Sequence, residues 1–379
     1  MKAIGIGLLG YGASGRIHTL GYRELSLLYP GRLPEIRLAG VCTRTPDSAR
    51  AAAQQGGFSV WYSEPSALIR DPAVEVIDCS LPNYLHREML LSAFAAGKHV
   101  YCEKPLALDG AEARQLVQAA GRAGVKVGLT FNFRFIPALM RARQLIAQGA
   151  LGGIYSFHAE YLHTGYQNPE RPMSWRLRKD QAGGGALVDL GSHLIDLIRY
   201  LLGEFKAVRA LLQTFIRERP VAQGSREKEP VTVEDAAWLQ ARLASGAIGT
   251  IEVTRFATGA LDDLNIEIYG EKGALRFKLM DANWLYWFDA TRSAGPLGGE
   301  QGWTRLETVQ HYPGAALPPP RSFLGWTRTH AENQFQFLRS LMEGTKVEPD
   351  ISDGLRTQLV MEAAYRSAEA GDWAPVQQE

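Results

Sequence analysis

The chain has 379 residues, which is enough for about two or three domains. It is 46% hydrophobic and 21% charged, as in an ordinary globular protein, and its 41 Lys and Arg residues balance 40 Asp and Glu residues. This balance argues against a protein that binds nucleic acid or an anionic membrane through a broad positive field. No apolar stretch approaches the roughly 20 residues that a membrane span requires. The three cysteines, none spaced C-x-x-C, predict no disulfide framework and no zinc or other metal site, and they indicate a cytoplasmic protein.

The first 130 residues alternate between strand and helix patterns. Strands are predicted near 3–9, 36–42, 74–80, 98–102 and 125–130, with helices near 14–28, 46–55, 84–96 and 109–122. Such alternation with short connections predicts a doubly wound α/β domain with a parallel sheet between layers of helices. A further helix is expected over about 137–148. The segment 21–37 lengthens the first helix–strand connection, and its sequence suggests no function.

A different pattern begins after about residue 150. Strands are predicted at 153–163, 206–217, 231–244, 247–256, 262–269 and 273–280, and "LASGAIG" (243–249) and "GEKG" (270–273) are typical of hairpin turns. These strands predict a mostly antiparallel sheet with a helix at 186–202 packed on it, while the polar segment 217–230 is expected to be a loop. Helices near 326–343 and 352–370 close the chain. We expect an α/β domain over 1–130 and an α+β domain over 131–379, whose closing helices can pack back on the first domain.

A glycine motif lies between the first predicted strand and the first predicted helix. Gly10, Gly12 and Gly15 have the spacing G-x-G-x-x-G, with Ala13 and Ser14 between the last two. Gly10 would permit a tight turn, Gly12 would let the backbone approach a pyrophosphate, and Gly15 would let the helix pack closely on the sheet. The helix start would offer free N–H groups to phosphates. The motif predicts a dinucleotide site, with an ordinary glycine turn as the alternative.

The end of the second strand indicates which dinucleotide binds. Thr43 and Arg44 stand where an acid would bind the adenosine ribose hydroxyls, and Asp47 comes only after Pro46. An arginine beside a hydroxyl suits a 2′-phosphate, which favours NADP over NAD. In the alternative, Arg44 stacks on the adenine and either cofactor binds.

Other candidate residues follow strand ends, where ligands bind in open α/β sheets. Glu103, Lys104 and Pro105 end one strand, and Lys104 is the candidate for contact with the substrate. Residues expected to border the cofactor are Ser80, Pro82, Asn83, His86, Glu103 and Asn132, although His86 could simply start a helix. Tyr161 and His163 end the first strand of the second domain and could reach substrate. Each of these supporting residues has an equally plausible structural role.

The segment "GGGALVDLGSHLIDLIRYLLG" (183–203) carries a narrow polar stripe on an apolar helix. Asp189, His193, Asp196 and Tyr200 follow one another at i, i+4, i+7 and i+11. A solvent-facing stripe is the common explanation, but this one contains no Lys or Glu. The pattern therefore favours a stripe that lines a cleft.

The order of these motifs resembles that of the glucose–fructose oxidoreductase / inositol dehydrogenase / MocA family over nearly the whole chain. The likeness rests on the glycine motif, Glu103-Lys104-Pro105 and "GGALVDLGSHLID" (184–196). It implies an N-terminal Rossmann domain, a C-terminal domain on a large antiparallel sheet, a cis Lys104–Pro105 bond and a homodimer or homotetramer. It also implies a sugar or cyclic polyol substrate, catalysis by Lys104, Asp189 and His193, and Trp175 and Arg176 in a loop over the nicotinamide half of the cofactor.

These residues suggest an NAD(P)-dependent oxidation of a secondary alcohol. His193 is the candidate base because an imidazole titrates near neutrality. Lys104 would stabilise developing charge on the oxygen, and Asp189 would bind substrate hydroxyls. Three alternatives remain: a glycoside-cleaving enzyme that oxidises the sugar transiently, a regulator that senses NAD(P) without catalysis, and an enzyme that reduces a non-sugar carbonyl.

Overall fold

The computed structural model describes residues 3–308, 312–319, 322 and 325–377. The chain forms two compact units, unit 1 with Met1–Phe135 and Gln310–Leu355, and unit 2 with Ile136–Val309 and Arg356–Glu379. The sequence suggested a domain boundary at residue 130, whereas the first unit extends to Phe135 and also includes the segment 310–355. Among the described residues, no helix combines the length and the apolar character needed to cross a membrane.

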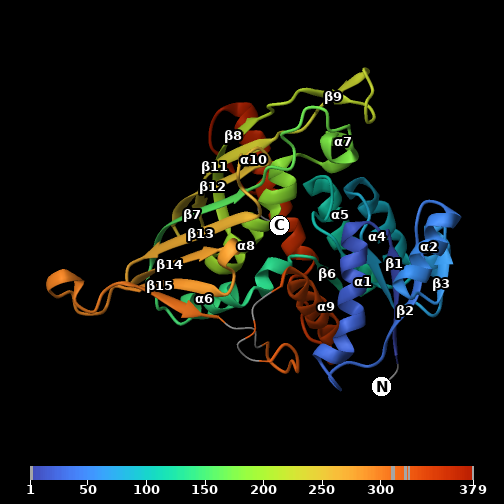
Figure 1. The fold of residues 1–379 in the computed structure, drawn as a ribbon, viewed down its shortest axis with the longest axis horizontal. Coiled ribbons are helices and arrows are strands. Elements are labelled where there is room, and N and C mark those ends of the chain that lie inside the picture. The colour runs from blue at the N-terminus through green and yellow to red at the C-terminus, as the bar shows by residue number, and fades with distance from the viewer. Residues whose placement is uncertain (1–2, 309–311, 320–321, 323–324, 378–379) are drawn as a thin grey trace. The chain divides into compact units, whose positions relative to one another are not determined.

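Unit 1 is built on a parallel sheet, as predicted, which has six strands in the order β3-β2-β1-β4-β5-β6. Strands β1, β2 and β3 are labelled in Figure 1. Its strands are β1 (Ile4–Leu9), β2 (Ile36–Cys42), β3 (Val60–Tyr62), β4 (Val76–Cys79), β5 (His99–Cys102) and β6 (Val127–Leu129). The helices between them are α1 (Ala13–Leu28), α2 (Pro46–Gly56), α3 (Pro65–Arg70), α4 (His86–Ala95) and α5 (Gly110–Ala123). The short elements β3 and α3 were not predicted, because three strand residues and six helix residues show too little periodicity. The parallel order brings the strand ends of β1, β4 and β5 side by side.

The segment 310–355 completes unit 1 with helix α9 (Trp326–Glu343), which packs against α1. The contact depends on Tyr29, just after α1, whose ring stacks on Phe335 with centroids 3.5 Å apart. The Tyr29 hydroxyl donates to Glu332 and accepts from Arg328 Nη2 at 2.9 Å. Tyr29 is 1% exposed. The insertion 21–37 therefore has a structural role, since it carries the anchor of α9.

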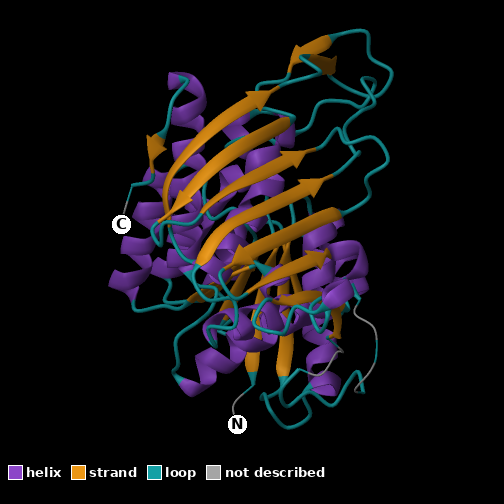
Figure 2. Ribbon diagram, turned by 90° about the vertical axis from the view of Figure 1, so that its left-hand side faces the viewer, coloured by secondary structure: helices purple, strands orange, loops and turns teal. Residues whose placement is uncertain are grey.

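Unit 2 contains a nine-stranded sheet in the order β16-β15-β14-β13-β7-β12-β11-β8-β17, whose long strands are seen side by side in Figure 2. The strands are β7 (Ile154–Leu162), β8 (Phe205–Gln213), β11 (Ala236–Leu243), β12 (Ile248–Thr254), β13 (Asp263–Gly270), β14 (Gly273–Lys278), β15 (Trp284–Asp289), β16 (Trp303–Glu307) and β17 (Ala374–Pro375). Both predicted hairpins are present, as β11–β12 and β13–β14. The sheet is mixed rather than fully antiparallel, because β12 runs parallel to β7.

Two helices of unit 2 lie close to their predicted ranges: α6 (Pro137–Ala147), which contacts β14 and β15, and α8 (Ser192–Leu202), which contacts β7. The four-residue helix α7 (Lys179–Ala182) was not predicted. The last helix, α10 (Ile351–Ala370), runs from the end of unit 1 into unit 2. The helix expected over 186–202 begins with a π-helical turn, Leu187–Gly191, so its first part departs from the predicted α-helical spacing.

The prediction of a loop at 217–230 is wrong. The segment forms a hairpin of β9 (Glu218–Pro220) and β10 (Lys228–Pro230). Arg219 is fully buried and donates to the carbonyl oxygens of Asn168 and Tyr166. A charged side chain in a polar segment gives no sequence signal of such burial, so the hairpin depends on a contact that only the fold supplies.

We predict that Tyr29→Ala lowers the free energy of unfolding of unit 1 by about 3–5 kcal/mol, the usual cost of deleting a buried aromatic ring. Tyr29→Phe keeps the stacked ring and removes one hydroxyl, so its loss should be about 1–2 kcal/mol. Urea unfolding followed by far-UV circular dichroism measures both variants. Equal losses for the two variants would contradict the role assigned to the ring.

Candidate active site

The glycine loop of unit 1 has the local geometry that a dinucleotide requires. Gly10 has φ +88°, and a Cβ there would lie 2.8 Å from the Ser80 carbonyl oxygen. A Cβ at Gly15 would lie 2.4 Å from the Gly10 carbonyl oxygen, so α1 can approach β1 only because Gly15 has no side chain. At Gly12, by contrast, a Cβ would meet no atom of the described residues within 4 Å. The three glycines thus show the turn, the open cradle and the close packing expected of each.

The start of α1 also suits a phosphate group. The helix begins at Ala13 and Ser14, directly after Gly12, and no described side chain caps it. Its first N–H groups therefore lack the partner that an N-cap side chain supplies elsewhere, and they carry the positive end of the helix dipole. An anion such as a pyrophosphate would accept hydrogen bonds from these N–H groups and would be stabilised by the dipole. The residues present fit a dinucleotide cofactor.

The end of β2 carries hydroxyl groups and a cation. Thr43 Oγ1 lies 2.6 Å from Ser48 Oγ, and Thr45 caps α2 by accepting from the Ser48 N–H. Arg44 is exposed beside them. Asp47 points away into solvent with 94% of its side chain exposed, 3.6 Å from Arg50. Asp47, the acid nearest to Thr43 in sequence, is therefore held in solvent.

The turn after β5 places Glu103 against the backbone of Lys104. Glu103 Oε2 accepts from the Lys104 N–H at 3.2 Å, while Oε1 lies 3.2 Å from His18 Nε2. The Lys104–Pro105 bond is cis, which confirms that expectation. The carboxylate of Glu103 thus joins the Lys104 turn to helix α1.

His18, Asp78 and Glu103 form a buried group that we call the His18 cluster. His18 Nδ1 lies 2.9 and 3.0 Å from the two Asp78 oxygens, and Tyr22 and Ser80 donate to the same carboxylate at 2.8 and 2.9 Å. Burial lowers the pKa of His18, but Asp78 and Glu103 outweigh it and raise the pKa to about 10. Burial raises the pKa of Glu103, but His18 outweighs it and lowers the pKa to about 2. The cluster is therefore held by charges that persist through the neutral pH range.

Four predicted cofactor residues lie in or near loops at the strand ends of unit 1. Ser80 directly follows β4 and bonds to Asp78, and Pro82 precedes a short 3₁₀ turn, Asn83–Leu85, in which Asn83 is 7% exposed. Asn132 is 2% exposed and donates to Thr329 Oγ1 at 2.9 Å. The bond from Asn132 ties its loop to α9, and the contact of each residue with the cofactor stays a prediction.

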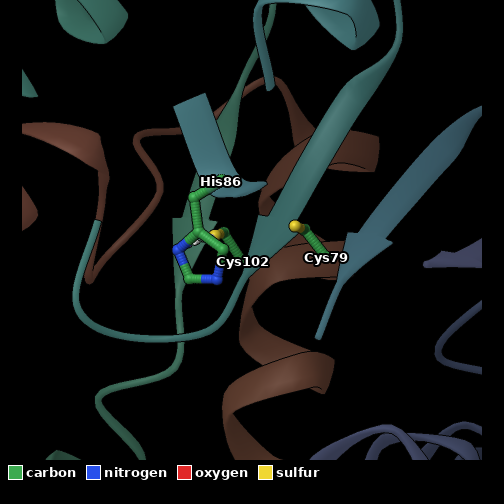
Figure 3. Close-up of side chains that lie close together, drawn as sticks. All are labelled: Cys79, His86 and Cys102. Carbon is green, nitrogen blue, oxygen red and sulfur yellow. Dashed lines mark hydrogen bonds between the residues drawn. The ribbon is translucent and has the colours of Figure 1, made fainter. Parts of the chain in front are cut away.

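His86 starts α4 and lies close to two thiols, those of Cys79 on β4 and Cys102 on β5 (Figure 3). The ligand atoms of the three residues lie within 4.8 Å of one another. However, His86 Nδ1 is 2.9 Å from the Pro105 carbonyl oxygen and Nε2 is 2.9 Å from that of Leu81. Both ring nitrogens thus face carbonyl oxygens, and His86 links the loop after β4 to the cis-proline turn. The arrangement is that of a structural bridge.

In unit 2, the residues predicted to reach substrate form one polar group with Asp262. Tyr161 donates to Asp262 Oδ1 at 2.7 Å, and His163 Nε2 lies 2.8 Å from the same oxygen. The rings of Tyr161 and His193 have centroids 6.3 Å apart. Burial raises the pKa of Asp262, but His163, Tyr161 and His193 outweigh it and lower the pKa. Since the side chains of His163 and Asp262 remain 33% and 40% exposed, the group can also bind a ligand.

Asp189 is held by a buried arginine. Arg255 Nη2 lies 2.9 Å from Asp189 Oδ2 and 3.2 Å from the Gly185 carbonyl oxygen, and its guanidinium lies 4.5 Å from the Tyr166 ring centroid. The side chain of Arg255 is 2% exposed, whereas that of Asp189 is 33% exposed. Asp189 lies in the π turn Leu187–Gly191, a feature frequent at functional sites. The carboxylate therefore has a fixed position and an accessible side.

The predicted polar stripe is not continuous. Asp196 is 1% exposed and lies 3.9 Å from Arg199, and Arg143 lies over the Tyr200 ring at 5.2 Å. The π turn changes the rotation of the chain between Asp189 and His193, so the i, i+4, i+7 arithmetic of a regular helix fails there. Asp196 contributes to packing rather than to a polar face.

Trp175 and Arg176 form a 3₁₀ turn, Trp175–Leu177, in which the Arg176 guanidinium lies 4.4 Å from the Trp175 ring centroid. Arg176 is exposed. Their contact with the cofactor stays a prediction.

Four residues that take part in these polar groups were not identified from the sequence: His18, Asp78, Arg255 and Asp262. An acid within the apolar run "VEVIDC" (74–79) and a histidine three residues after Gly15 were the available signals for Asp78 and His18. Arg255 and Asp262 stand just outside strands and gave no comparable signal.

Comparisons with known proteins agree with this geometry. The family described as "Oxidoreductase family, NAD-binding Rossmann fold" matches residues 4–131, and "GFO/IDH/MocA C-terminal domain" matches residues 139–276. Levoglucosan dehydrogenase of Pseudarthrobacter phenanthrenivorans is 34% identical, over 100% of this chain and 99% of its own. scyllo-Inositol 2-dehydrogenase (NADP(+)) of Bacillus subtilis is 28% identical over 97% and 94%. The solved structure of levoglucosan dehydrogenase with NADH and levoglucosan matches with a TM-score of 0.94 and 34% identity, over 100% of both chains.

Proposed function

Because the chain belongs to the GFO/IDH/MocA oxidoreductase family, we propose that it transfers a hydride between NAD(P) and a secondary hydroxyl of a sugar or cyclic polyol. The observation that carries this proposal is the local geometry of unit 2. There Asp189, oriented by Arg255, precedes His193 by one helical turn, and Asp262 with His163 supplies further hydroxyl partners. Such closely spaced acceptors and donors suit a polyhydroxylated ring.

The charges of unit 2 favour a neutral substrate. Arg255, the buried cation of this group, is already paired with Asp189, and Asp262 adds a second carboxylate. A phosphate group would meet these two acids, while the buried Arg255 is already engaged by Asp189. We propose an unphosphorylated pyranose, with anhydro sugars such as levoglucosan and alkyl glucosides as first substrates, because relatives named for both types match this chain.

The chemistry divides among three side chains in our proposal. When bound, NAD(P) supplies the hydride acceptor. His193 takes the proton of the reacting hydroxyl, Lys104 donates a hydrogen bond to the same oxygen, and Asp189 accepts from a neighbouring hydroxyl. In the reverse direction His193 returns the proton to a ketone.

We predict that Lys104→Ala and His193→Ala each lower kcat about 10²–10⁴-fold, the usual contribution of a positioned proton-transfer or charge-stabilising group. The exposed Lys228 on β10 provides a matched control, and Lys228→Ala should keep the wild-type kcat. Absorbance at the nicotinamide band with levoglucosan, methyl β-glucoside, myo-inositol and glucose 6-phosphate measures activity, and NAD(P)H fluorescence measures nucleotide binding.

The same assay distinguishes the alternatives. Near wild-type turnover in either catalytic variant would contradict the assignment of roles. Release of an aglycone without net cofactor reduction would indicate the glycoside-cleaving enzyme instead, and nucleotide binding without any turnover would indicate a regulator.

We also propose that NADP is the preferred cofactor, because the exposed Arg44 follows β2 together with Thr43, Thr45 and Ser48, whose hydroxyl groups are hydrogen-bonded to one another. Relatives of this chain are associated with both cofactors. A levoglucosan dehydrogenase structure holds NADH, and the inositol dehydrogenase is named for NADP(+).

We predict that Arg44→Ala lowers kcat/KM for NADP about 10–100-fold, as expected for a lost charge-assisted bond to phosphate, and changes the value for NAD less than about threefold. Arg50→Ala, an exposed arginine in the same helix, serves as the control. Steady-state kinetics with both cofactors measures the effect. Equal losses for NAD and NADP would show instead that Arg44 stacks on the adenine.

We propose that the open face of the nine-stranded sheet joins copies of the chain into a homodimer or homotetramer. Leu211 and Ile248 lie on this face with 64% and 57% exposure, and Leu211 is paired across the sheet with Trp238. Exposed apolar side chains on an ordered sheet are typical of subunit contacts.

We predict that the double variant Leu211→Glu/Ile248→Glu sediments as a smaller species than the wild type, because two buried charges would oppose the contact. Leu27→Glu, at an equally exposed leucine of α1, should leave the sedimentation coefficient unchanged. A monomeric wild-type protein would overturn the proposal.

The three cysteines support a reducing compartment. All three are buried free thiols in the described part of the chain. We propose that the enzyme acts in the cytoplasm, where such thiols persist.

A further inference from the structure

His18 lies between two carboxylates that end neighbouring strands. Its Nδ1 faces Asp78 at 2.9 Å, at the end of β4, and its Nε2 lies 3.2 Å from Glu103 Oε1, after β5, an ion-pair distance without hydrogen-bond geometry. A neutral imidazole has one N–H and one lone pair, so it can donate to only one of these acids. Both contacts are favourable only for the doubly protonated ring. The geometry itself therefore calls for an imidazolium in a side chain that is 0% exposed.

The other groups around the ring do not compete for this charge. Tyr22 and Ser80 donate to Asp78, Ser80 Oγ also lies 3.1 Å from His18 Nδ1, and the ring of Tyr101 lies 5.2 Å from that of His18. His330 on α9 lies 5.9 Å away, and neither of its nitrogens finds a hydrogen-bond partner among the described residues. Burial and the charge of His18 lower the pKa of His330 to about 4, so it stays neutral at physiological pH. The charged groups facing His18 are the two carboxylates.

The cluster connects two parts of the cofactor side of unit 1. His18 stands three residues after Gly15, on the helix whose start forms the phosphate cradle. Glu103 accepts from the Lys104 N–H at 3.2 Å, so the carboxylate that contacts His18 also holds the backbone of the Lys104 turn. The carbonyl of His18 accepts from Gln334 Nε2 at 3.0 Å, which fixes this part of α1 against α9.

We propose that His18 is a permanent imidazolium that acts as a positioning residue, holding Glu103 ionised and, through it, the backbone of Lys104. The catalytic part of this inference rests on the proposed dehydrogenase function. Without the imidazolium, the Glu103 carboxylate would lose the neighbour that contributes most to lowering its pKa. Burial would then raise this pKa toward the neutral range. Protonation would then remove the charge that orders the turn.

The test is the pH dependence of kcat/KM. In the wild type neither His18, with a pKa of about 10, nor Glu103, with a pKa of about 2, titrates between pH 5 and 9. His18→Gln should introduce a new acid limb, with activity falling about tenfold for each pH unit below the raised pKa of Glu103. The double variant His18→Gln/Glu103→Gln should lack this limb, because an amide does not titrate.

Tyr22→Phe provides the structural control. It removes one hydrogen bond to Asp78 and leaves both contacts of His18 in place. It should lower stability without a new limb. A His18→Gln profile parallel to that of the wild type, or a limb that is absent from the wild type and survives in the double variant, would overturn the proposal.

A second measurement does not depend on turnover or on the folding of the His18 variant. Nitrogen NMR of the full chain with ¹⁵N-labelled histidine should show one imidazole with two N–H protons from pH 5 to 9, and Glu103→Gln should lower the pH at which that signal is lost. A wild-type protein without such a ring at pH 8 would refute the imidazolium even if the enzyme oxidises sugars. If no sugar is oxidised but the signal is present, the ionisation stands and the proposed function fails.

Discussion

The cofactor side of unit 1 depends on one buried charge balance, the contact of His18 with Asp78 and Glu103. Isolated charges are costly to bury, and a carboxylate at the end of each of two adjacent strands would repel the other if both stayed unpaired. One imidazolium between them resolves both difficulties. Because His18 is part of α1, the same contact sets the helix against the strand ends. The glycine loop at Gly12 and the turn at Lys104 are therefore held in fixed positions relative to each other by electrostatics as well as by packing. The stability that His18 contributes is fully present below its ordinary pKa of 6.5 and is lost as the pH rises through about 10.

Packing around α9 complements this electrostatic constraint. The helix comes from the segment 310–355, far from α1 in sequence, and Tyr29 supplies the ring on which Phe335 stacks. Arg328 and Glu332 then satisfy the Tyr29 hydroxyl, so an aromatic contact and a buried ion pair share one place. Asn132, expected beside the cofactor, donates to Thr329 on the same helix. A residue near a strand end thus takes part in closing unit 1, which shows that strand-end position alone does not separate ligand contacts from structural ones.

Most of the fold was accessible from sequence because it is encoded in local periodicity. The strand at 36–42 and the helix at 326–343 were predicted to the residue, and Gly10 has the positive φ that its motif implies. The failures have a different cause. The π turn before α8 inserts rotation that no apolar pattern reports, and the hairpin at 217–230 depends on Arg219 reaching carbonyl groups about 50 positions away. In the same way, His18 stands three residues after the glycine motif, but its contacts with two acids from distant strands could not be predicted from that position.

The carboxylates of the two units have different hydrogen-bond and ion-pair partners, and these partners determine whether a carboxylate can also bind a ligand. In unit 1, the side chain of Glu103 is 13% exposed, and one of its oxygens faces His18 while the other accepts from the Lys104 N–H. Such a carboxylate has little capacity left for substrate and serves to fix the backbone. In unit 2, Arg255 engages Asp189 through one oxygen, while a third of the side chain remains exposed. Asp262 is likewise held by Tyr161 and His163 through a single oxygen, Oδ1. The other oxygen of Asp262 is thereby preoriented as an acceptor, of the kind that selective recognition of ring hydroxyls requires. In our proposal, sugar recognition falls to unit 2 and the rigid support of Lys104 to unit 1.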